Sequence, residues 1–316
     1  MSMTHESLSP VAVVGAGALG CLFGGMLARA GIPLTLIGRP VHVAAIRRDG
    51  LRFESRGQVT LIPVAATEDM AAVRGARLVL LCVKSTGTDD AARAMAPHLG
   101  RDAVVVNLQN GVDNVERISA HVGNRVFPGL VYVAAEMAGP GHVRHTGGGS
   151  LTIGELAAFR HAGADRRRLD EVAALFTAAG IKVTISDTVE VDLWTKLVMN
   201  CAYNAISALT GSQYAKMVSL PEIRTLMTDL VHEVMAVATA KGVRLPDSLV
   251  EAAIRLADGM PVTISSTAQD LLRGRRTEID HLNGYVAREG AALGIATPVN
   301  RTLNALVKLA EQKGSQ

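Results

Sequence analysis

The ten residues VAVVGAGALG, from Val11 to Gly20, restrict the fold of this chain more than any other segment. Their apolar run is typical of a strand buried on both faces, and it leads directly into a GxGxxG spacing. Glycine allows a tight turn there and a close approach of a pyrophosphate to the N–H groups that open the next helix. The segment therefore predicts the strand, turn and helix of a dinucleotide-binding domain. The expected cofactor contacts are Gly15, Ala16, Gly17, Ala18, Leu19 and Gly20.

Short apolar runs alternate with helical segments through the first 110 residues. This alternation predicts parallel strands, right-handed crossovers and an α/β fold with a Rossmann-type, doubly wound sheet. The strands are expected at 11–15, 33–38, 77–84 and 103–109, with a helix at 18–30. Residues 51–67 read as two strands joined around Gly57, and residues 125–154 are strand-rich. A helix at 166–179 and a strand at 181–186 follow.

The strand pattern ends near residue 187, and only helical patterns follow it. Helices are expected at 189–209, 220–242, 247–258, 262–273, 278–293 and 298–313. A chain of 316 residues is also long for a single hydrophobic core. We therefore predict a Rossmann-type domain at 1–187 and an all-helical substrate and catalytic domain at 188–316.

Charge and aromatic content argue against nucleic acid as a partner. The net charge is only +3, and the Lys and Arg residues are dispersed. Their one short cluster, 166–168, is typical of a solvated helix face. Because aromatic residues make up 3% of the chain, few stacking platforms for bases are available.

The cysteines and histidines predict no metal site and no disulfides. Cys21, Cys82 and Cys201 lie far apart in apolar runs, and the nine histidines form neither HxxxH nor HExxH spacing. A reducing cytoplasm is the simplest compartment for such a chain.

The uncharged run 11–28 is not interpreted as a signal or a membrane span. A secretory signal begins with positive residues, whereas the segment before this run contains Glu6 and no Lys or Arg. Five glycines within the run also make a poor span. We therefore expect a soluble cytoplasmic protein with no membrane partner.

Arg39 decides which nicotinamide cofactor is expected. The second strand ends in LIGRP, where proteins that bind NAD usually place a carboxylate for the ribose hydroxyls. A guanidinium would instead pair with the 2′-phosphate of NADPH. The alternative is an ordinary solvated arginine in a loop.

Two further strands end in polar residues that would lie on the same sheet edge. LLCVKS ends in Lys84, and VVVNLQNG ends in Gln109, Asn110 and Gly111. Ligands of open α/β sheets bind beyond the carboxyl ends of the strands, where these residues emerge. An exposed strand terminus and a plain turn are the alternatives.

A polar stripe on a largely apolar helix is the strongest signal for chemistry. Lys196, Asn200 and Asn204 recur every four residues in LWTKLVMNCAYNAIS and drift only about 80° around a helix axis. Buried polar groups need partners, and a cleft with a polar ligand would provide them. An ammonium can stabilise charge on the oxygen of a ketone that accepts hydride, and can donate the proton. A lone lysine that snorkels to solvent is the alternative.

A second polar cluster lies in TISSTAQDLLRGRRTEIDHLNG, residues 263–284. It contains Ser265, Ser266, Asp270, Glu278 and Asp280. Spacing alone favours ordinary roles for them: Ser266 and Asp270 as a helix cap and a surface charge, and TEID as a helix start.

Taken in order, these motifs resemble the ketopantoate reductase family from residue 11 to about residue 310. The matching segments are the glycine loop, CVK, QNG, PGHVRHTGGG, WTKLVMNCAYN, SSTAQD and RRTEIDHLNG. The resemblance implies a Rossmann-type domain and a helical domain, with the active site in the cleft between them. It also implies reduction of 2-dehydropantoate to (R)-pantoate with NADPH, a step toward pantothenate and coenzyme A.

The resemblance also implies roles for residues of the helical domain. Lys196 would be the general acid, and Asn200 and Asn204 would hold the substrate. Ser266 would contact the carboxylate end of the substrate, and Glu278 would lie near both cofactor and substrate.

In the first domain, the resemblance implies that Asn110 lies near the nicotinamide ribose and the substrate. Lys84 would serve the adenosine side of the cofactor. Ala135 would contact the cofactor through its backbone.

One departure leaves the substrate open. Many members of the family carry another substrate-binding asparagine about ten residues beyond the second helix asparagine, where this chain has Tyr214. The chain could thus be a paralogue that reduces a related branched 2-oxo acid. A nicotinamide-binding regulator without catalysis and a β-hydroxyacid dehydrogenase are further alternatives. Whether the helical domain forms a homodimer stays open.

Overall fold

The structure is a computed structural model that describes residues 8–159 and 165–313; the segment that contains Glu6 lies outside them. The chain divides into two compact units, Met1–Val189 and Glu190–Gln316. Each is described by itself.

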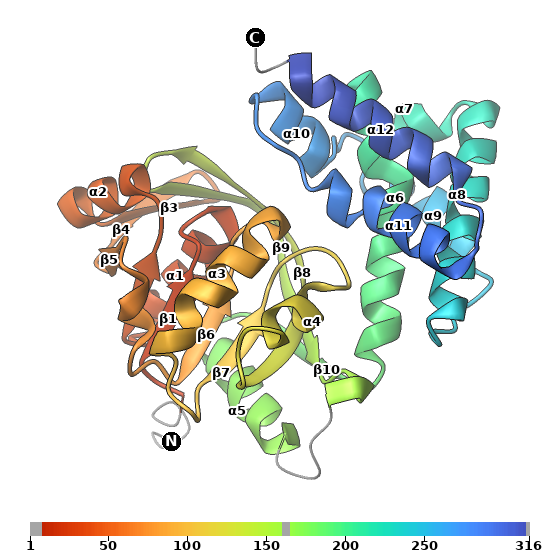
Figure 1. Ribbon diagram of the computed structural model, residues 1–316. Helices are drawn as coiled ribbons and strands as arrows, with labels where there is room; N and C mark the ends of the chain where they lie inside the picture. The colour runs from red at the N-terminus through yellow and green to blue at the C-terminus, as the bar shows by residue number, and fades with distance from the viewer. Residues whose placement is uncertain (1–7, 160–164, 314–316) are drawn as a thin grey trace. The chain divides into compact units, whose positions relative to one another are not determined.

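Six parallel strands form the centre of the first unit, in the order β5-β2-β1-β6-β7-β8 (Figure 1). When these six strands are numbered 1 to 6 along the chain, the order is 3-2-1-4-5-6, which is that of a Rossmann sheet. The predicted fold class is therefore confirmed. Every residue of β1, β6 and β7 is buried, as expected for strands covered on both faces. The strands are β1 (Val11–Val14), β2 (Leu34–Ile37), β5 (Ala65–Thr67), β6 (Leu78–Leu81), β7 (Val104–Asn107) and β8 (Arg125–Gly139).

An antiparallel extension makes the sheet mixed. The long strand β8 turns back at Gly141 into β9 (His142–Gly154), which pairs with β3 (Leu51–Ser55) and with β10 (Lys182–Ser186). The strand β4 (Gln58–Ile62) completes the hairpin around Gly57 that the sequence predicted. The short strand β5 was not predicted.

The sheet curves into a half-barrel around the helix α1 (Ala18–Arg29). This helix contacts β2 near one end of the strand order and both β3 and β4 at the other end. Gly24 and Gly25 allow this close packing, because a Cβ at either position would lie within 2.8 Å of a Leu36 or Phe53 side-chain carbon. Packing of the sheet therefore explains two of the five glycines in the uncharged run.

Among its described residues, the first unit has four more α-helices. They are α2 (Pro40–Asp49), α3 (Thr88–Met95), α4 (Asn114–Ser119) and α5 (Asp165–Ala178).

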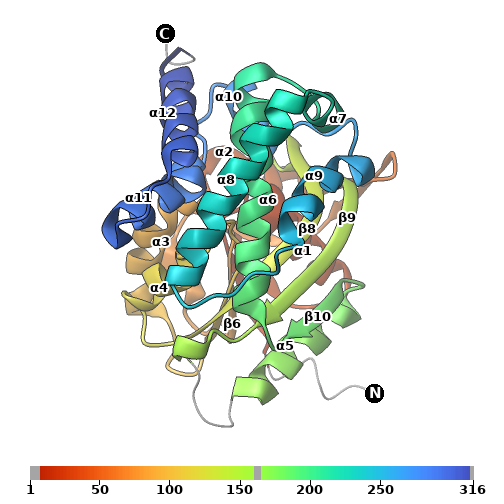
Figure 2. The same cartoon turned by 90° about the vertical axis from the view of Figure 1, so that its right-hand side faces the viewer.

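The second unit is helical, with the polar-striped helix α6 (Val189–Thr210) at its centre (Figure 2). The Tyr203 hydroxyl donates a hydrogen bond to the Ala253 carbonyl at 2.8 Å, which joins α6 to α9. The ring of Trp194 lies 6.0 Å from that of Tyr285 on α11. The other helices are α7 (Tyr214–Val218), α8 (Pro221–Ala240), α9 (Leu249–Gly259), α10 (Ser266–Leu272), α11 (Asn283–Leu293) and α12 (Pro298–Lys313).

Most of the predicted helices agree with the structure to within two residues at each end, and three segments differ by more. The short helix α7 was not predicted. The helix expected at 262–273 begins only at Ser266, because the Ser265 hydroxyl caps it. The segment expected at 278–293 is a short 3-10 helix at Ile279–His281 followed by α11.

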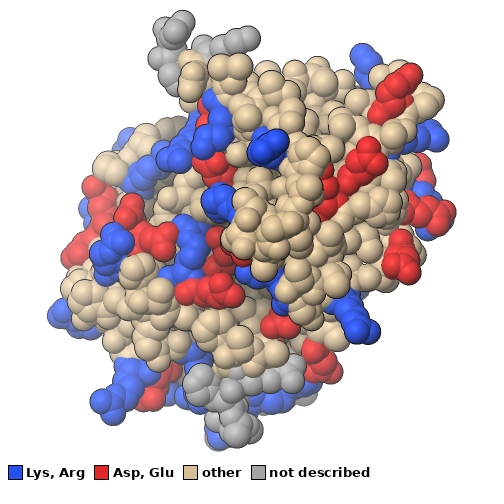
Figure 3. Space-filling view, turned by 45° about the vertical axis from the view of Figure 1, so that its right-hand side comes forward, with Lys and Arg blue, Asp and Glu red and all other residues tan. Residues whose placement is uncertain are grey.

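Acidic and basic side chains are interspersed on the face of the molecule drawn in Figure 3. Within residues 8–159 and 165–313, no helix is long and apolar enough to cross a membrane. The same part of the chain contains no group of three or more His, Cys, Asp or Glu side chains that could hold a metal ion.

Candidate active site

Two of the three motif glycines are required by the packing of the protein itself. Gly15 has φ +111°, and a Cβ there would lie 2.6 Å from the backbone nitrogen of Val83. A Cβ at Gly20 would lie 2.0 Å from the Gly15 carbonyl oxygen. A side chain at Gly15 would push the turn away from the segment that follows β6. A side chain at Gly20 would push α1 away from the turn.

Gly17 is different, because a Cβ at this position would meet no protein atom within 4 Å. Gly17 precedes α1, whose first internal hydrogen bond runs from the Cys21 N–H to the Gly17 carbonyl at 2.8 Å. The N–H groups of Ala18, Leu19 and Gly20 come before that bond, in the first turn, where anions bind. The open space and these donors fit the pyrophosphate of a dinucleotide.

The end of β2 is tied directly to the glycine loop. The N–H groups of Gly15 and Ala16 both donate to the Ile37 carbonyl, at 2.8 and 3.0 Å. A Cβ at Gly38 would lie 2.5 Å from the Ala16 Cβ. Arg39 follows at once, with an exposed side chain that pairs with no carboxylate among the described residues. The fold therefore brings Arg39 beside the loop.

The residues that follow β6 and β7 also come together. The Ser85 hydroxyl donates to the Asn110 carbonyl at 2.8 Å, which joins the segment after Lys84 to the segment after β7. Lys84 is exposed and Asn110 is partly buried. Gly111 has φ +103°, so the chain turns sharply directly after Asn110.

A buried polar cluster beneath Asn110 was not anticipated from the sequence. The Asn114 amide donates to the Asn110 carbonyl at 2.7 Å. The Gln109 amide donates to the Thr88 hydroxyl at 2.8 Å, and that hydroxyl in turn donates to the Asn114 side-chain oxygen at 2.9 Å. The available signal was a pair of asparagines four residues apart, at 110 and 114, where a helix begins.

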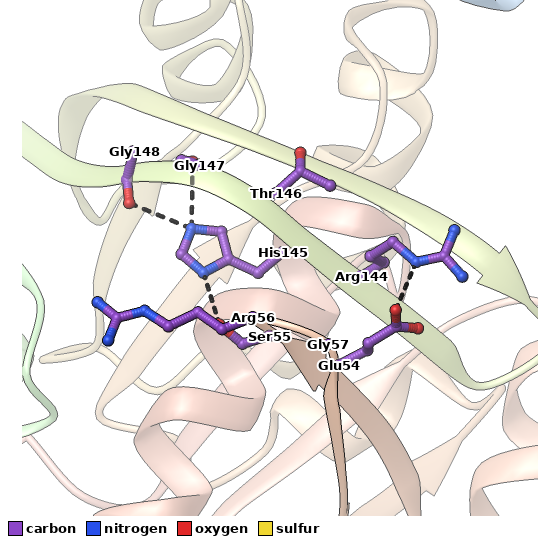
Figure 4. Close-up of a pocket in the computed structure, with 9 residues that line it drawn as sticks. All are labelled: Glu54, Ser55, Arg56, Gly57, Arg144, His145, Thr146, Gly147 and Gly148. Atoms are coloured by element: carbon purple, nitrogen blue, oxygen red, sulfur yellow. Dashed lines mark hydrogen bonds and ion pairs between the residues drawn. The ribbon is translucent and has the colours of Figure 1, made fainter.

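Ala135 lies on β8 opposite His145 of β9. His145 lines a cavity of about 410 Å³ within the first unit. Figure 4 shows its ring with the other residues that line the cavity. The His145 Nε2 lies 3.1 Å from the Gly147 and Gly148 carbonyls, and its Nδ1 lies 3.5 Å from the Ser55 hydroxyl. The ring therefore joins β3 to an irregular part of β9. None of the predicted site residues lines this cavity.

In the second unit, α6 carries Lys196, Asn200 and Asn204 as predicted. Lys196 and Asn200 are partly buried, and the Asn204 side chain is only 3% exposed. Burial lowers the pKa of Lys196 to about 8, while the Glu278 carboxylate acts in the opposite direction by favouring the ammonium. The structure therefore brings Lys196 and Glu278 into electrostatic contact, although 82 positions separate them in the sequence.

The segment around Glu278 is held by the last helix. The Thr277 N–H donates to the Glu311 carboxylate on α12 at 2.8 Å, and the Thr277 hydroxyl bonds to the same oxygen. Asp280 lies in an ion pair with Lys308 at 3.0 Å. Of the two acidic residues in TEID, only Glu278 contributes to the environment of Lys196.

Ser265, and not Ser266, is the helix cap. The Ser265 hydroxyl accepts from the Ala268 N–H at 3.0 Å and donates to the Asn204 carbonyl at 3.1 Å. These bonds attach the start of α10 to α6 beside Asn204. Ser266 is the exposed first residue of α10, so its hydroxyl is not used as that cap.

Tyr214 is part of the core of the helical unit. Its side chain is 7% exposed, and its ring centroid lies 4.3 Å from that of Tyr203. Burial raises the pKa of the Tyr214 hydroxyl to about 12. Tyr214 therefore packs where the resemblance would have placed a substrate-binding amide.

Sequence comparisons match both units. The family model described as "Ketopantoate reductase PanE/ApbA" matches residues 11–158, and that described as "Ketopantoate reductase PanE/ApbA C terminal" matches residues 188–311. The chain is 38% identical to a 2-dehydropantoate 2-reductase of Halobacterium salinarum, over 96% of this chain and 99% of that protein.

Solved structures show the same fold. A PanE/ApbA family ketopantoate reductase from Ralstonia eutropha JMP134 is 50% identical with a TM-score of 0.89, covering 97% of this chain and 99% of that one. A D-mandelate dehydrogenase in complex with NADH is 25% identical with a TM-score of 0.84, covering 96% and 99%. The similarity thus extends over both units.

Proposed function

The chain belongs to the ketopantoate reductase family, and on this premise we propose that it reduces 2-dehydropantoate to (R)-pantoate with NADPH, a step toward pantothenate and coenzyme A. The observation that carries the proposal is a partly buried Lys196 whose ammonium is favoured by the Glu278 carboxylate. A lysine with its pKa lowered to about 8 remains mostly protonated at neutral pH, yet it gives up a proton more readily than an exposed lysine.

Lys196 acts as the general acid in this proposal. Negative charge grows on the ketone oxygen of the substrate during reduction, and the ammonium stabilises that charge and donates the proton. The Glu278 carboxylate keeps the amine charged until the transfer. Asn200 and Asn204, one and two helical turns further along α6, hold the substrate in register with the ammonium.

The first unit holds the cofactor, which supplies the hydride when bound. The first turn of α1 accepts the pyrophosphate, and Arg39 pairs with the 2′-phosphate. Lys84 contacts the adenosine side of the cofactor. Asn110 contacts the nicotinamide ribose and the substrate. The Ala135 backbone and Glu278 complete the cofactor contacts, and Ser266 contacts the substrate carboxylate.

Consumption of NADPH tests the proposed activity. Purified protein is mixed with NADPH and a panel of 2-oxo acids, and absorbance of the reduced nicotinamide is followed. We expect 2-dehydropantoate to give the highest kcat/KM. NADPH binding without turnover of any 2-oxo acid would instead indicate a nicotinamide-binding regulator.

Tyr214 favours one second candidate, reduction of another branched 2-oxo acid. Its buried ring provides no amide for a substrate hydroxyl, in contrast to the asparagine expected from the family resemblance. The panel therefore includes branched 2-oxo acids without that hydroxyl. Because the D-mandelate dehydrogenase has the same fold, it also includes a phenyl-substituted 2-oxo acid. A higher kcat/KM for one of these would replace 2-dehydropantoate as the substrate.

Replacing Arg39 by Asp is expected to lower kcat/KM for NADPH at least about tenfold relative to NADH. The carboxylate would repel a 2′-phosphate and accept hydrogen bonds from a ribose hydroxyl. Steady-state kinetics with both cofactors measures the ratio. Arg101→Asp makes the same charge change at an exposed position before β7 and should leave the ratio unchanged. An unaltered preference in Arg39→Asp would remove this residue from the cofactor site.

A further inference from the structure

We infer that Asn114 is a positioning residue for the proposed reduction: it fixes the loop that presents Asn110 to cofactor and substrate. This inference rests on the proposed function of Asn110. Asn114 itself is 1% exposed, so it acts through Asn110 and does not reach a ligand.

Two buried donors converge on one carbonyl. The Asn110 carbonyl accepts from the Asn114 amide at 2.7 Å and from the Ser85 hydroxyl at 2.8 Å. Ser85 is fully buried. A carbonyl held by two donors from different segments has little freedom to rotate, which fixes the peptide between Asn110 and Gly111.

The orientation of the Asn114 amide is itself determined by its neighbours. Its oxygen accepts from the Thr88 hydroxyl at 2.9 Å and from the Arg117 guanidinium at 3.3 Å. The Thr88 hydroxyl also lies 3.0 Å from the Ser85 carbonyl, so the Arg117 guanidinium, which can only donate, decides which end of the Asn114 amide is the oxygen. The Arg117 guanidinium is fixed by Asp89, with its Nε 3.0 Å from the carboxylate. The Asn114 nitrogen must therefore face the Asn110 carbonyl.

The opposite end of β7 provides a comparison within the same unit. The Asn124 amide donates to the carbonyls of Gly100 and Ala103, at 2.8 and 3.0 Å. Both asparagines thus secure a loop next to β7 through backbone carbonyls. Only the loop held by Asn114 contains a residue that we assign to the active site, so only Asn114 should affect catalysis.

A double-mutant cycle with Asn114→Asp and Asn110→Ala tests the inference. Aspartate preserves the size of the side chain and the acceptor for Thr88 and Arg117, but it places an oxygen against the Asn110 carbonyl. We expect Asn114→Asp to lower kcat/KM for the 2-oxo acid about tenfold. In the Asn110→Ala background it should cause no further loss, because the side chain that it positions is absent. Ser85→Ala, a milder change, should show the same coupling.

Asn124→Asp is the matched control and should change thermal stability without changing kcat/KM. Additive losses in the cycle, or an equal kinetic loss in Asn124→Asp, would reduce Asn114 to a purely structural role. The NADPH affinity of the same variants is also measured by nucleotide fluorescence. Here too, a loss in Asn114→Asp that disappears in the Asn110→Ala background supports the inference, and additive losses contradict it. A wild-type protein that binds NADPH but reduces no 2-oxo acid would overturn the proposed function, and this outcome is distinct from additivity.

Discussion

Replacing Lys196 by Ala is expected to lower kcat by about a thousandfold or more, while NADPH affinity changes less than about twofold. In the proposed mechanism, alanine removes both the charge that stabilises the ketone oxygen and the proton that the product needs. It leaves the glycine loop and Arg39 in the other unit intact. Stopped-flow reduction measures the chemical step, and nucleotide fluorescence measures binding.

Lys216→Ala is the control for this variant. Lys216 is an exposed lysine of α7 in the same helical unit, and its loss should leave kcat unchanged. The thermal midpoint of Lys196→Ala should not fall below that of the wild type, because burial makes the ammonium unfavourable in the folded state. Equal losses of turnover and NADPH affinity would indicate a structural lysine instead.

The pH profile of the wild-type enzyme gives an independent reading of the same group. In the proposed mechanism the protonated amine of the free enzyme is the active form, so kcat/KM should decline as pH rises through about 8. Glu278 favours the charged amine; Glu278→Gln should therefore move this decline to lower pH. A profile that stays flat up to pH 10 would exclude Lys196 as the proton donor.

Gly17→Val is expected to weaken NADPH binding about a hundredfold while leaving the fold intact. The Cβ of the new side chain would enter space with no protein atom within 4 Å, so it causes no clash in the folded protein. That space is where we place the pyrophosphate, whose contacts with the first turn of α1 would be lost. Binding is measured by fluorescence titration and folding by the thermal midpoint.

Gly123→Val is matched to it, since a Cβ at this exposed loop position also meets no protein atom. Both variants should keep the wild-type thermal midpoint, and only Gly17→Val should lose NADPH. Gly20→Val should instead destabilise the protein, because its Cβ would lie 2.0 Å from a carbonyl oxygen. Unchanged NADPH affinity in Gly17→Val would place the cofactor elsewhere.

Much of the fold could be predicted because its determining patterns are local. The apolar runs and the glycine turn identify β1, β2, β6 and β7, and their crossovers imply the parallel pairing that the structure confirms. The half-barrel could not be predicted in this way. It depends on contacts of α1 with β3 and β4, strands that follow the helix in sequence and lie at the far end of the sheet order. The helix α7 is too short, at five residues, to show a period.

The candidate site could be predicted where its residues share one helix. The four-residue spacing of Lys196, Asn200 and Asn204 identifies the stripe on α6, although their roles stay predictions. The sequence could not decide which of Ser265 and Ser266 caps α10, since both are the same residue type at adjacent positions. The role that we infer for Asn114 depends on the backbone carbonyl of Asn110, so the spacing of the two asparagines alone does not show that they interact.

The hydrogen bonds between Thr277 and Glu311 also affect how the protein can be assembled during translation. The segment that carries Glu278 is secured only after nearly the whole chain has been synthesised, whereas the strands of the first unit are complete by Ser186. Because domains fold as units from the N-terminus during synthesis, the first unit can fold while the surroundings of Glu278 are still incomplete. In the proposed function, a chain truncated before Glu311 would bind dinucleotide without reducing a substrate.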